Sequence, residues 1–98
     1  MQITTAHPRL YFDGNSQLTE SSFMVVQGTL DDIGALGFTL DSALGMRFTF
    51  VQEDEGPAGE PDALLFNGTI AHSPVLGHFI LADSEGVHWL SELAVRDA

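Results

Sequence analysis

The amino-acid sequence predicts a small domain built mostly of β-strands. Apolar and polar residues alternate with period 2 in several short runs, most clearly over residues 44–50. Turn-forming residues, including ten glycines, interrupt the chain at short intervals, which suits short strands better than long helices. With 98 residues, of which 44% are hydrophobic, the chain has enough apolar side chains for one core. We therefore expect a single domain over residues 1–98.

The first half of the chain contains two expected strands. Leu10–Phe12 is a short apolar run that ends at an Asp-Gly-Asn turn. Residues 23–30 form a longer run with apolar side chains on both faces, which predicts a strand that is covered on both sides. The side chains of Phe23 and Val25 have two possible environments. They either contact another subunit or pack under residues 35–40. This segment is itself either a short strand or irregular.

The clearest strand lies in the middle of the chain, where Leu44, Met46, Phe48 and Phe50 alternate with small and polar residues. This pattern is typical of a strand with one face buried and one face exposed.

The alternation resumes over residues 63–72, with Leu64, Phe66 and Ile70 on one face. Gly68 interrupts this face, which predicts a bulge or a close approach of a neighbouring backbone.

Two hairpins are expected to follow this strand. The turn Ser73–Leu76 joins residues 63–72 to a strand over residues 77–82. The loop Ser84–Gly86, with glycine at its last position, joins that strand to a final one over Val87–Leu90.

Together these runs make about six strands in mostly antiparallel order. We favour a small, partly open SH3-like barrel, because closure removes exposed strand edges, and a single curled sheet is the alternative. Residues 91–95 are expected to add one helical turn with Ser91 as its cap. The expected core residues are Met46, Phe48, Phe66, Ile70 and Leu81.

Charge is the strongest functional signal in the composition. The chain has 14 acidic residues against three arginines and no lysine, which gives a formal net charge of −11. Direct nucleic-acid binding needs a basic patch that neutralises phosphates, and an anionic membrane would repel this chain. The charge would instead steer the protein toward basic partners, and it would also keep a small protein soluble. Frequent Ala, Gly and Asp without Lys indicate a GC-rich bacterial or phage genome.

The absence of cysteine excludes disulfides, thiolate catalysis and cysteine-ligated zinc. The first residues lack the charged and apolar regions of a signal peptide, and no run approaches the roughly 18 apolar residues of a membrane span. We therefore expect a cytoplasmic location.

The most acidic segment is residues 53–62, which combine five acids with two prolines and two glycines. Neither a helical nor a strand pattern is present, so a flexible surface loop is expected. The loop would present its acids to a basic partner, and these are Glu53, Asp54, Glu55, Glu60 and Asp62.

Whether the histidines can form a metal site depends on the register of the strands that carry them. A four-residue loop in the first hairpin sets Ile70 opposite Phe79 and separates His72 from His78, and in the second hairpin His88 would then oppose Ala82. A five-residue loop sets His72 opposite His78, close enough to share a metal, but it removes Phe79 and Leu81 from the core face. The hydrophobic pattern favours the first register, and we expect no metal and no other cofactor.

Catalytic signatures are absent from the sequence. It contains no nucleophile elbow, zinc-protease motif, phosphate loop or dinucleotide fingerprint, so an enzyme is not expected. The favoured function is a small acidic module of the immunity, anti-defence or nucleic-acid-mimic type, which binds a basic protein surface. Two alternatives stay open. One is a structural or accessory subunit, for example a homodimer, that acts through oligomer contacts. The other is a small enzyme or ligand binder with a defined pocket.

Overall fold

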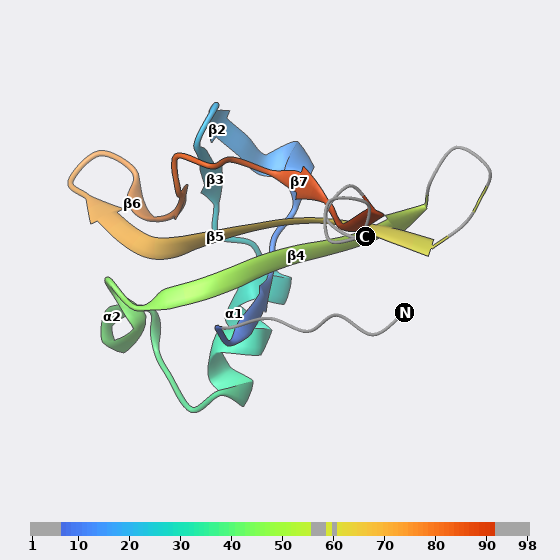
Figure 1. The fold of residues 1–98 in the computed structure, drawn as a ribbon. Helices are drawn as coiled ribbons and strands as arrows, with labels where there is room; N and C mark the ends of the chain where they lie inside the picture. Colours follow the sequence, from blue (N-terminus) through green and yellow to red (C-terminus); the bar gives the residue numbers. More distant parts are fainter. Residues whose placement is uncertain (1–6, 56–58, 60, 92–98) are drawn as a thin grey trace.

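The computed structural model describes residues 7–55, 59 and 61–91. Within this part the chain forms one open sheet of seven strands with few helices (Figure 1), which confirms the predicted mostly β fold. Of the two expected architectures, the open sheet is the one observed. Its elements are β1 (Arg9–Tyr11), a 3₁₀ helix (Gly14–Ser16), β2 (Gln17–Thr19), β3 (Ser22–Met24), α1 (Gln27–Ala35), α2 (Leu40–Ala43), β4 (Arg47–Glu55), β5 (Pro61–Ser73), β6 (Gly77–Ala82) and β7 (His88–Trp89).

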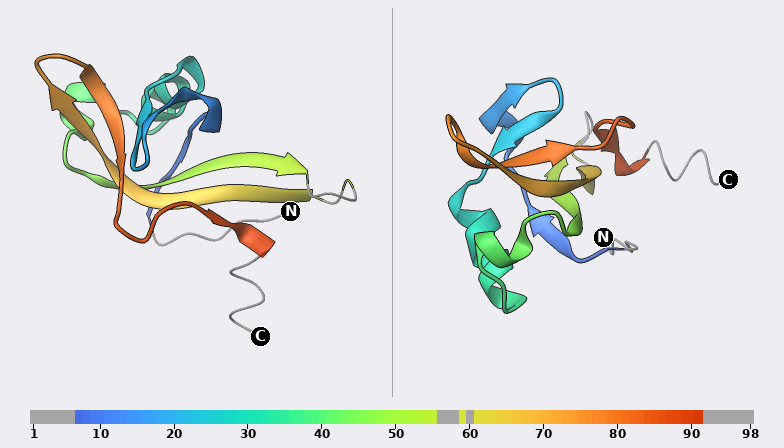
Figure 2. Two further views of the ribbon diagram at one scale, coloured as in Figure 1. Left: turned by 90° about the horizontal axis from the view of Figure 1, so that it is seen from above. Right: turned by 90° about the vertical axis from the view of Figure 1, so that its left-hand side faces the viewer.

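The long strand β5 organises the sheet, whose strand order is β1-β4-β5-β6-β3-β2. One edge of β5 pairs with β4 from Pro61 to Thr69. Its other edge pairs with β7 at Leu64 and Leu65 and with β6 from Gly68 onward. Strand β1 runs parallel to β4, and the other strand pairs are antiparallel. Figure 2 shows the resulting bend, in which the β5–β6 hairpin turns away from the β4–β5 hairpin.

The first predicted hairpin is present, but its preferred register is wrong. His72 lies opposite His78 and Ile70 lies opposite Ile80, which is the register that the hydrophobic pattern disfavoured, and Ser73 pairs with Gly77, so the loop is residues 74–76. Leu81 is consequently 41% exposed, so its predicted burial is also wrong. Residues 79–82 are all apolar, and alternation alone therefore fits both registers.

Gly68 lies at a point where strands β5 and β6 approach each other closely. A Cβ atom at Gly68 would collide with the backbone oxygen of Leu81, so the two strands approach closely here. The small residue Ala82 lies directly opposite Gly68. The predicted close backbone approach at Gly68 is therefore confirmed.

The second predicted hairpin is wrong in its strand pairing. The turn forms, since the backbone N–H of Gly86 donates to the Asp83 carbonyl and Gly86 has a positive φ of 76°. However, β7 pairs with β5, so His88 lies opposite Leu65 instead of Ala82. The reason is that β3 already occupies the second edge of β6.

A helix replaces most of the predicted strand over residues 23–30. Only its beginning belongs to β3, and the chain then forms α1, which directs Thr29 and Ile33 into the interior. These two residues are four apart and so lie on the same face of a helix. Residues 35–40 contain no strand, and Leu40 begins α2, whose N-terminus is capped by Thr39.

The hydrophobic core lies between the sheet and the two helices. Phe48, Phe66 and Ile70 are buried as predicted, and Met46 is half-buried against them. The ring of Phe66 is central, because it packs edge-on against Phe12 at 4.7 Å and stacks on Phe50 at 5.1 Å between ring centroids. The buried members of the cluster are Leu10, Phe12, Phe23, Ile33, Ala43, Phe48, Phe50, Phe66, Ile70, Ile80 and Ala82.

The same core resolves the position of Phe23 and Val25, which had been considered for an oligomer contact. Phe23 is only 3% exposed, and Val25 packs half-buried against the core together with Phe38 and Leu40. The ring of Phe23 packs against the rings of Phe12 and Phe66 of the same chain. Met24, on the opposite face, is the exposed residue of β3, at 53%.

The acidic segment 53–62 is not a loop over its whole length. Strand β4 continues to Glu55 and β5 begins at Pro61, with Asp54 opposite Asp62. Residues 56–58 and Glu60 lie outside the described residues. The same is true of the predicted helical turn after Ser91, although Leu90 and Ser91 themselves are helical.

Candidate functional site

The first candidate surface is the acidic hairpin end, defined here as Glu53 and Asp54 of β4 with the paired residues 61–63 of β5. It lies at the end of the β4–β5 hairpin that is farthest from α2 (Figures 1 and 2). Glu53 and Asp54 are both exposed. The backbone of Glu55 belongs to β4, and Glu60 is outside the described residues.

Asp62 differs from the other acids of this segment because it is buried, at 8% exposure. Its carboxylate accepts hydrogen bonds from the backbone N–H of Ala63 at 2.9 Å, the backbone N–H of Ser91 at 3.1 Å and the Ser91 hydroxyl at 2.8 Å. Burial raises the pKa of Asp62, but these hydrogen bonds outweigh burial and hold the pKa below its ordinary value. Asp62 therefore ties β5 to Ser91, which follows β7.

One ion pair joins an arginine to an acid across the sheet. Arg47 and Asp83 form a bidentate pair, with Nη1 donating to Oδ1 at 2.8 Å and Nη2 donating to Oδ2. This hydrogen bonding lowers the pKa of Asp83 and raises the pKa of Arg47.

Several exposed acids have no such partner. Glu20, Glu53 and Glu85 make no hydrogen bond or ion pair within the part of the chain that the structure describes. Arg9, the other described arginine, also makes no ion pair there. Glu20 and Glu53 therefore have no charged partner within the described part of the chain.

The second candidate surface is the apolar outer face, defined here as Met24, Ala71, Phe79 and Leu81. Met24 lies beside Phe79, and Phe79 lies beside Ala71 across the next strand pair. Met24 and Leu81 are 53% and 41% exposed, and Phe79 is half-buried. Sequence reasoning missed this surface because it assigned Phe79 and Leu81 to the core. The sequence would have predicted this apolar surface if the register that sets His72 opposite His78 had been favoured.

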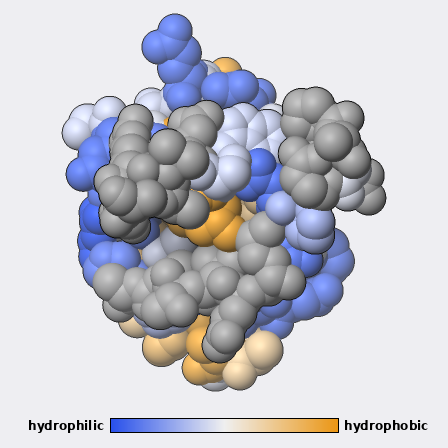
Figure 3. Space-filling view, turned by 45° about the vertical axis from the view of Figure 1, so that its right-hand side comes forward, coloured by the Kyte–Doolittle hydropathy of each residue, from blue (hydrophilic) through white to orange (hydrophobic). Residues whose placement is uncertain are grey.

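Hydrophilic residues dominate the side of the molecule that Figure 3 shows. Apolar residues are visible at the centre of this view, between segments drawn in grey, and along its lower margin. Leu36, which directly follows α1, is 42% exposed.

The pockets on the described surface include the following two. One, of about 290 Å³, is lined mainly by Phe12, Phe23, Leu64 and Val87, with Glu20 among its polar residues. The other, of about 210 Å³, is lined by Arg9, Leu10, Tyr11, Asp32, Val51 and Glu53. Their volumes lie at or below the lower end of the roughly 300–1,000 Å³ of typical small-molecule sites.

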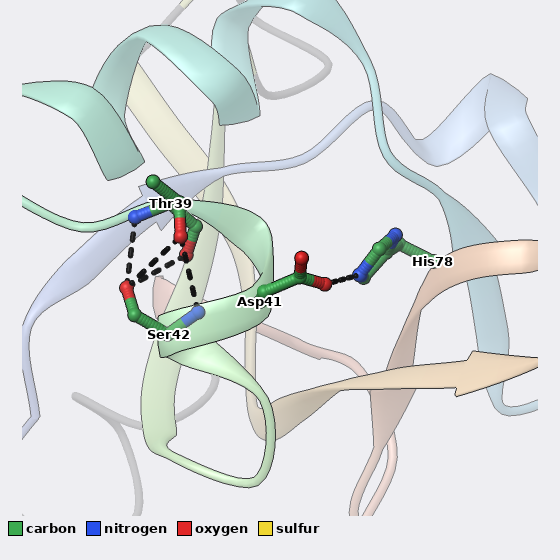
Figure 4. A network of polar contacts seen from close by, with 4 residues as sticks. All are labelled: Thr39, Asp41, Ser42 and His78. Carbon is green, nitrogen blue, oxygen red and sulfur yellow. Dashed lines mark hydrogen bonds and ion pairs between the residues drawn. The ribbon is translucent and has the colours of Figure 1, made fainter.

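A third cluster lies at the turn end of the β5–β6 hairpin and contains His72, His78 and Asp41. The Nε2 atom of His78 is 2.9 Å from Oδ1 of Asp41 (Figure 4), and the ring centroids of His72 and His78 are 4.9 Å apart. Asp41 is positioned by the first turn of α2, where Thr39 and Ser42 form a capping box. No sequence signal predicts the contact between Asp41 and His78, because these residues are far apart in the chain.

His88 lies apart from this cluster, since it belongs to β7 and is paired with Leu65 of β5. The described residues contain no group of three or more His, Cys, Asp or Glu side chains arranged to hold a metal. None of the described helices is long and apolar enough to cross a membrane. Comparisons with protein-family models, curated proteins and solved structures find no match to this chain.

Proposed function

We propose that this protein is a small acidic protein-binding module that acts on a basic surface of another protein, in the manner of immunity, anti-defence or nucleic-acid-mimic proteins. The observation that supports the proposal is the acidic hairpin end, where Glu53 and Asp54 are exposed at one extremity of the domain. With a net charge of −11, the surrounding field favours cationic surfaces at long range.

The contact we propose uses carboxylates that are already positioned by paired strands. Glu53 and Asp54 lie in regular register with β5, so little backbone entropy is lost when they meet a partner. Asp62 is excluded from the contact because its carboxylate is buried and hydrogen-bonded to Ala63 and Ser91. Glu55 and Glu60 stay candidates on sequence grounds.

The experiment is capture from a cell extract by the immobilised full chain at low and at high salt, followed by binding measurements with each purified captured protein. The variant Glu53→Gln/Asp54→Asn serves as the comparison. We expect a basic protein that binds at low salt, is released at high salt and binds the variant more weakly. The proposal fails if no captured protein is basic, or if capture is insensitive to both salt and the substitutions.

A second candidate is an accessory subunit that assembles through the apolar outer face, and the exposure of Met24 and Leu81 favours it. This assembly would tolerate salt, because apolar burial does not weaken as charges are screened. Light scattering on the wild type and on Met24→Lys would test it. A salt-resistant dimer that the substitution dissociates supports this candidate, and a monomer of the wild type at all protein concentrations and salt levels excludes self-assembly.

A further inference from the structure

The β5–β6 hairpin places two imidazole rings at a separation that suits a shared metal ion. His72 and His78 are directly opposite each other, and their ring centroids are 4.9 Å apart with an interplanar angle of 67°. Two imidazole rings that bind one metal through nitrogens at about 2.0–2.1 Å have centroids about 5 Å apart. The observed separation of the two rings therefore matches that of two imidazole ligands of one ion.

The backbone on both sides of the pair is fixed. Each histidine belongs to a strand, and the adjacent pair Ser73 and Gly77 closes the hairpin. The Ser73 hydroxyl accepts a hydrogen bond from the backbone N–H of Leu76 at 2.9 Å, and Gly77 has a φ of 71° that suits glycine. The entropy of bringing the two rings together has thus been lost on folding, before any ion binds.

The pair is accessible and has lone pairs available. His72 is exposed and makes no hydrogen bond within the described part of the chain, and the His78 side chain is 23% exposed. Asp41 contacts His78 at Nε2, which leaves Nδ1 of that ring without a hydrogen bond. A carboxylate on the second nitrogen of a histidine ligand raises its basicity and orients the ring, as in many zinc sites.

We infer that His72 and His78 form a binding site for one divalent late transition-metal ion such as Zn²⁺ or Ni²⁺, with Asp41 as a positioning residue and water completing the coordination. Imidazole ligands favour these ions over Mg²⁺ and Ca²⁺, which prefer oxygen. The negative field of the protein raises the local concentration of any cation. The inference does not depend on the proposed protein partner.

The test is calorimetric titration of the full chain with Zn²⁺ and with Ni²⁺ at neutral pH. The variants are His72→Ala and His78→Ala, and His88→Ala is the matched control that removes a histidine from β7. We expect one equivalent of metal to bind to the wild type and to the control, and at least tenfold weaker binding to either hairpin variant. Circular dichroism checks that each variant is folded, and the exposed position of His72 makes that variant the more decisive one.

Asp41→Asn tests the positioning role separately. It should weaken metal binding by about 10–100-fold, because the neutral amide orients the His78 ring less firmly, and Asp41→Glu, which keeps the carboxylate, should restore part of the affinity. The inference is overturned if the wild type binds no Zn²⁺ or Ni²⁺, or if a variant without both His72 and His78 still binds with wild-type affinity. It is also overturned if Mg²⁺ competes equally, since the acidic surface would then be the binding site.

Discussion

Phe48 shows how a single side chain contributes to this core. It is fully buried and packs edge-on against Phe50, with 6.2 Å between the ring centroids. Phe48→Ala should lower the free energy of unfolding by about 3–5 kcal/mol, because it removes a large apolar group and leaves a cavity. Chemical denaturation measures this change. A loss below about 1 kcal/mol would be incompatible with a core position for Phe48.

Glycine residues in two environments give opposite predictions. A Cβ at Gly68 would meet the backbone of Leu81, so Gly68→Ala should destabilise the protein by about 1–3 kcal/mol through overpacking. A Cβ at Gly34, in helix α1, meets nothing within 4 Å, so Gly34→Ala should stabilise by about 0.5–1 kcal/mol. Thermal and denaturant unfolding of both variants would check the signs. Equal effects would argue against the close approach at Gly68.

Asp62 makes the stability dependent on pH. Because its pKa is lower in the folded protein than in the unfolded chain, its contribution is complete above the unfolded pKa of about 3.9 and is lost as the pH falls through the folded value. Asp62→Asn should therefore lower the melting temperature at pH 7. Below about pH 4, the melting temperature of the variant should fall less than that of the wild type. Melting curves of both proteins between pH 7 and pH 3 measure this, and parallel pH profiles would contradict it.

At the level of the secondary-structure elements, helix α1 closes the outer edge of β1. The backbone N–H of Tyr11 donates to Oδ2 of Asp32 at 2.8 Å, and the Thr29 hydroxyl donates to the Tyr11 carbonyl at 2.7 Å. Gly28 allows this contact, because a Cβ there would collide with the Tyr11 ring. The helix thus satisfies backbone groups that an edge strand would otherwise expose to another chain.

This docking can be tested at Thr29, which is fully buried. Thr29→Val retains the shape but loses the hydrogen bond to Tyr11, so it should destabilise by about 1–3 kcal/mol. Thr29→Ser, which retains the hydroxyl, is the control and should lose less. If the order of the two variants is reversed, packing of the methyl group outweighs the hydrogen bond.

Some elements were predictable because their sequence signal is local. The alternation at Met46, Phe48 and Phe50 identified β4, and the Ser-Pro turn identified the β5–β6 hairpin. Helix α1 was missed because the apolar residues at the start of this run alternate as in a strand. The helical spacing of Thr29 and Ile33, which are four residues apart, begins only after them. The partner of β7 was missed because it depends on which strand edges other segments already occupy, which no local pattern contains.

At the level of the whole molecule, some features of the surface could be predicted from the sequence and others could not. The excess of acids was evident from the sequence, and so was their concentration around Glu53 and Asp54. Burial of Asp62 was not predictable, because it depends on Ser91, a residue distant in the chain. The apolar outer face and the His72–His78 pair both follow from one register, which the four apolar residues 79–82 leave undecided.

The proposed function makes a kinetic prediction for the acidic hairpin end. Exposed charges at the border of a contact accelerate association more than they slow dissociation, and the effect falls as salt rises. The matched control removes two other exposed acids, Glu20 and Glu85, which lie outside the hairpin end, so the total charge change is the same.

The most direct measurement is the association rate constant with the captured basic partner as a function of ionic strength. It should be made for the wild type, for Glu53→Gln/Asp54→Asn and for the control Glu20→Gln/Glu85→Gln. The account predicts that the hairpin variant associates more slowly at low salt and has a flatter salt dependence than the control. Equal rates and slopes for the two variants, or a wild-type rate that does not change with salt, would contradict it.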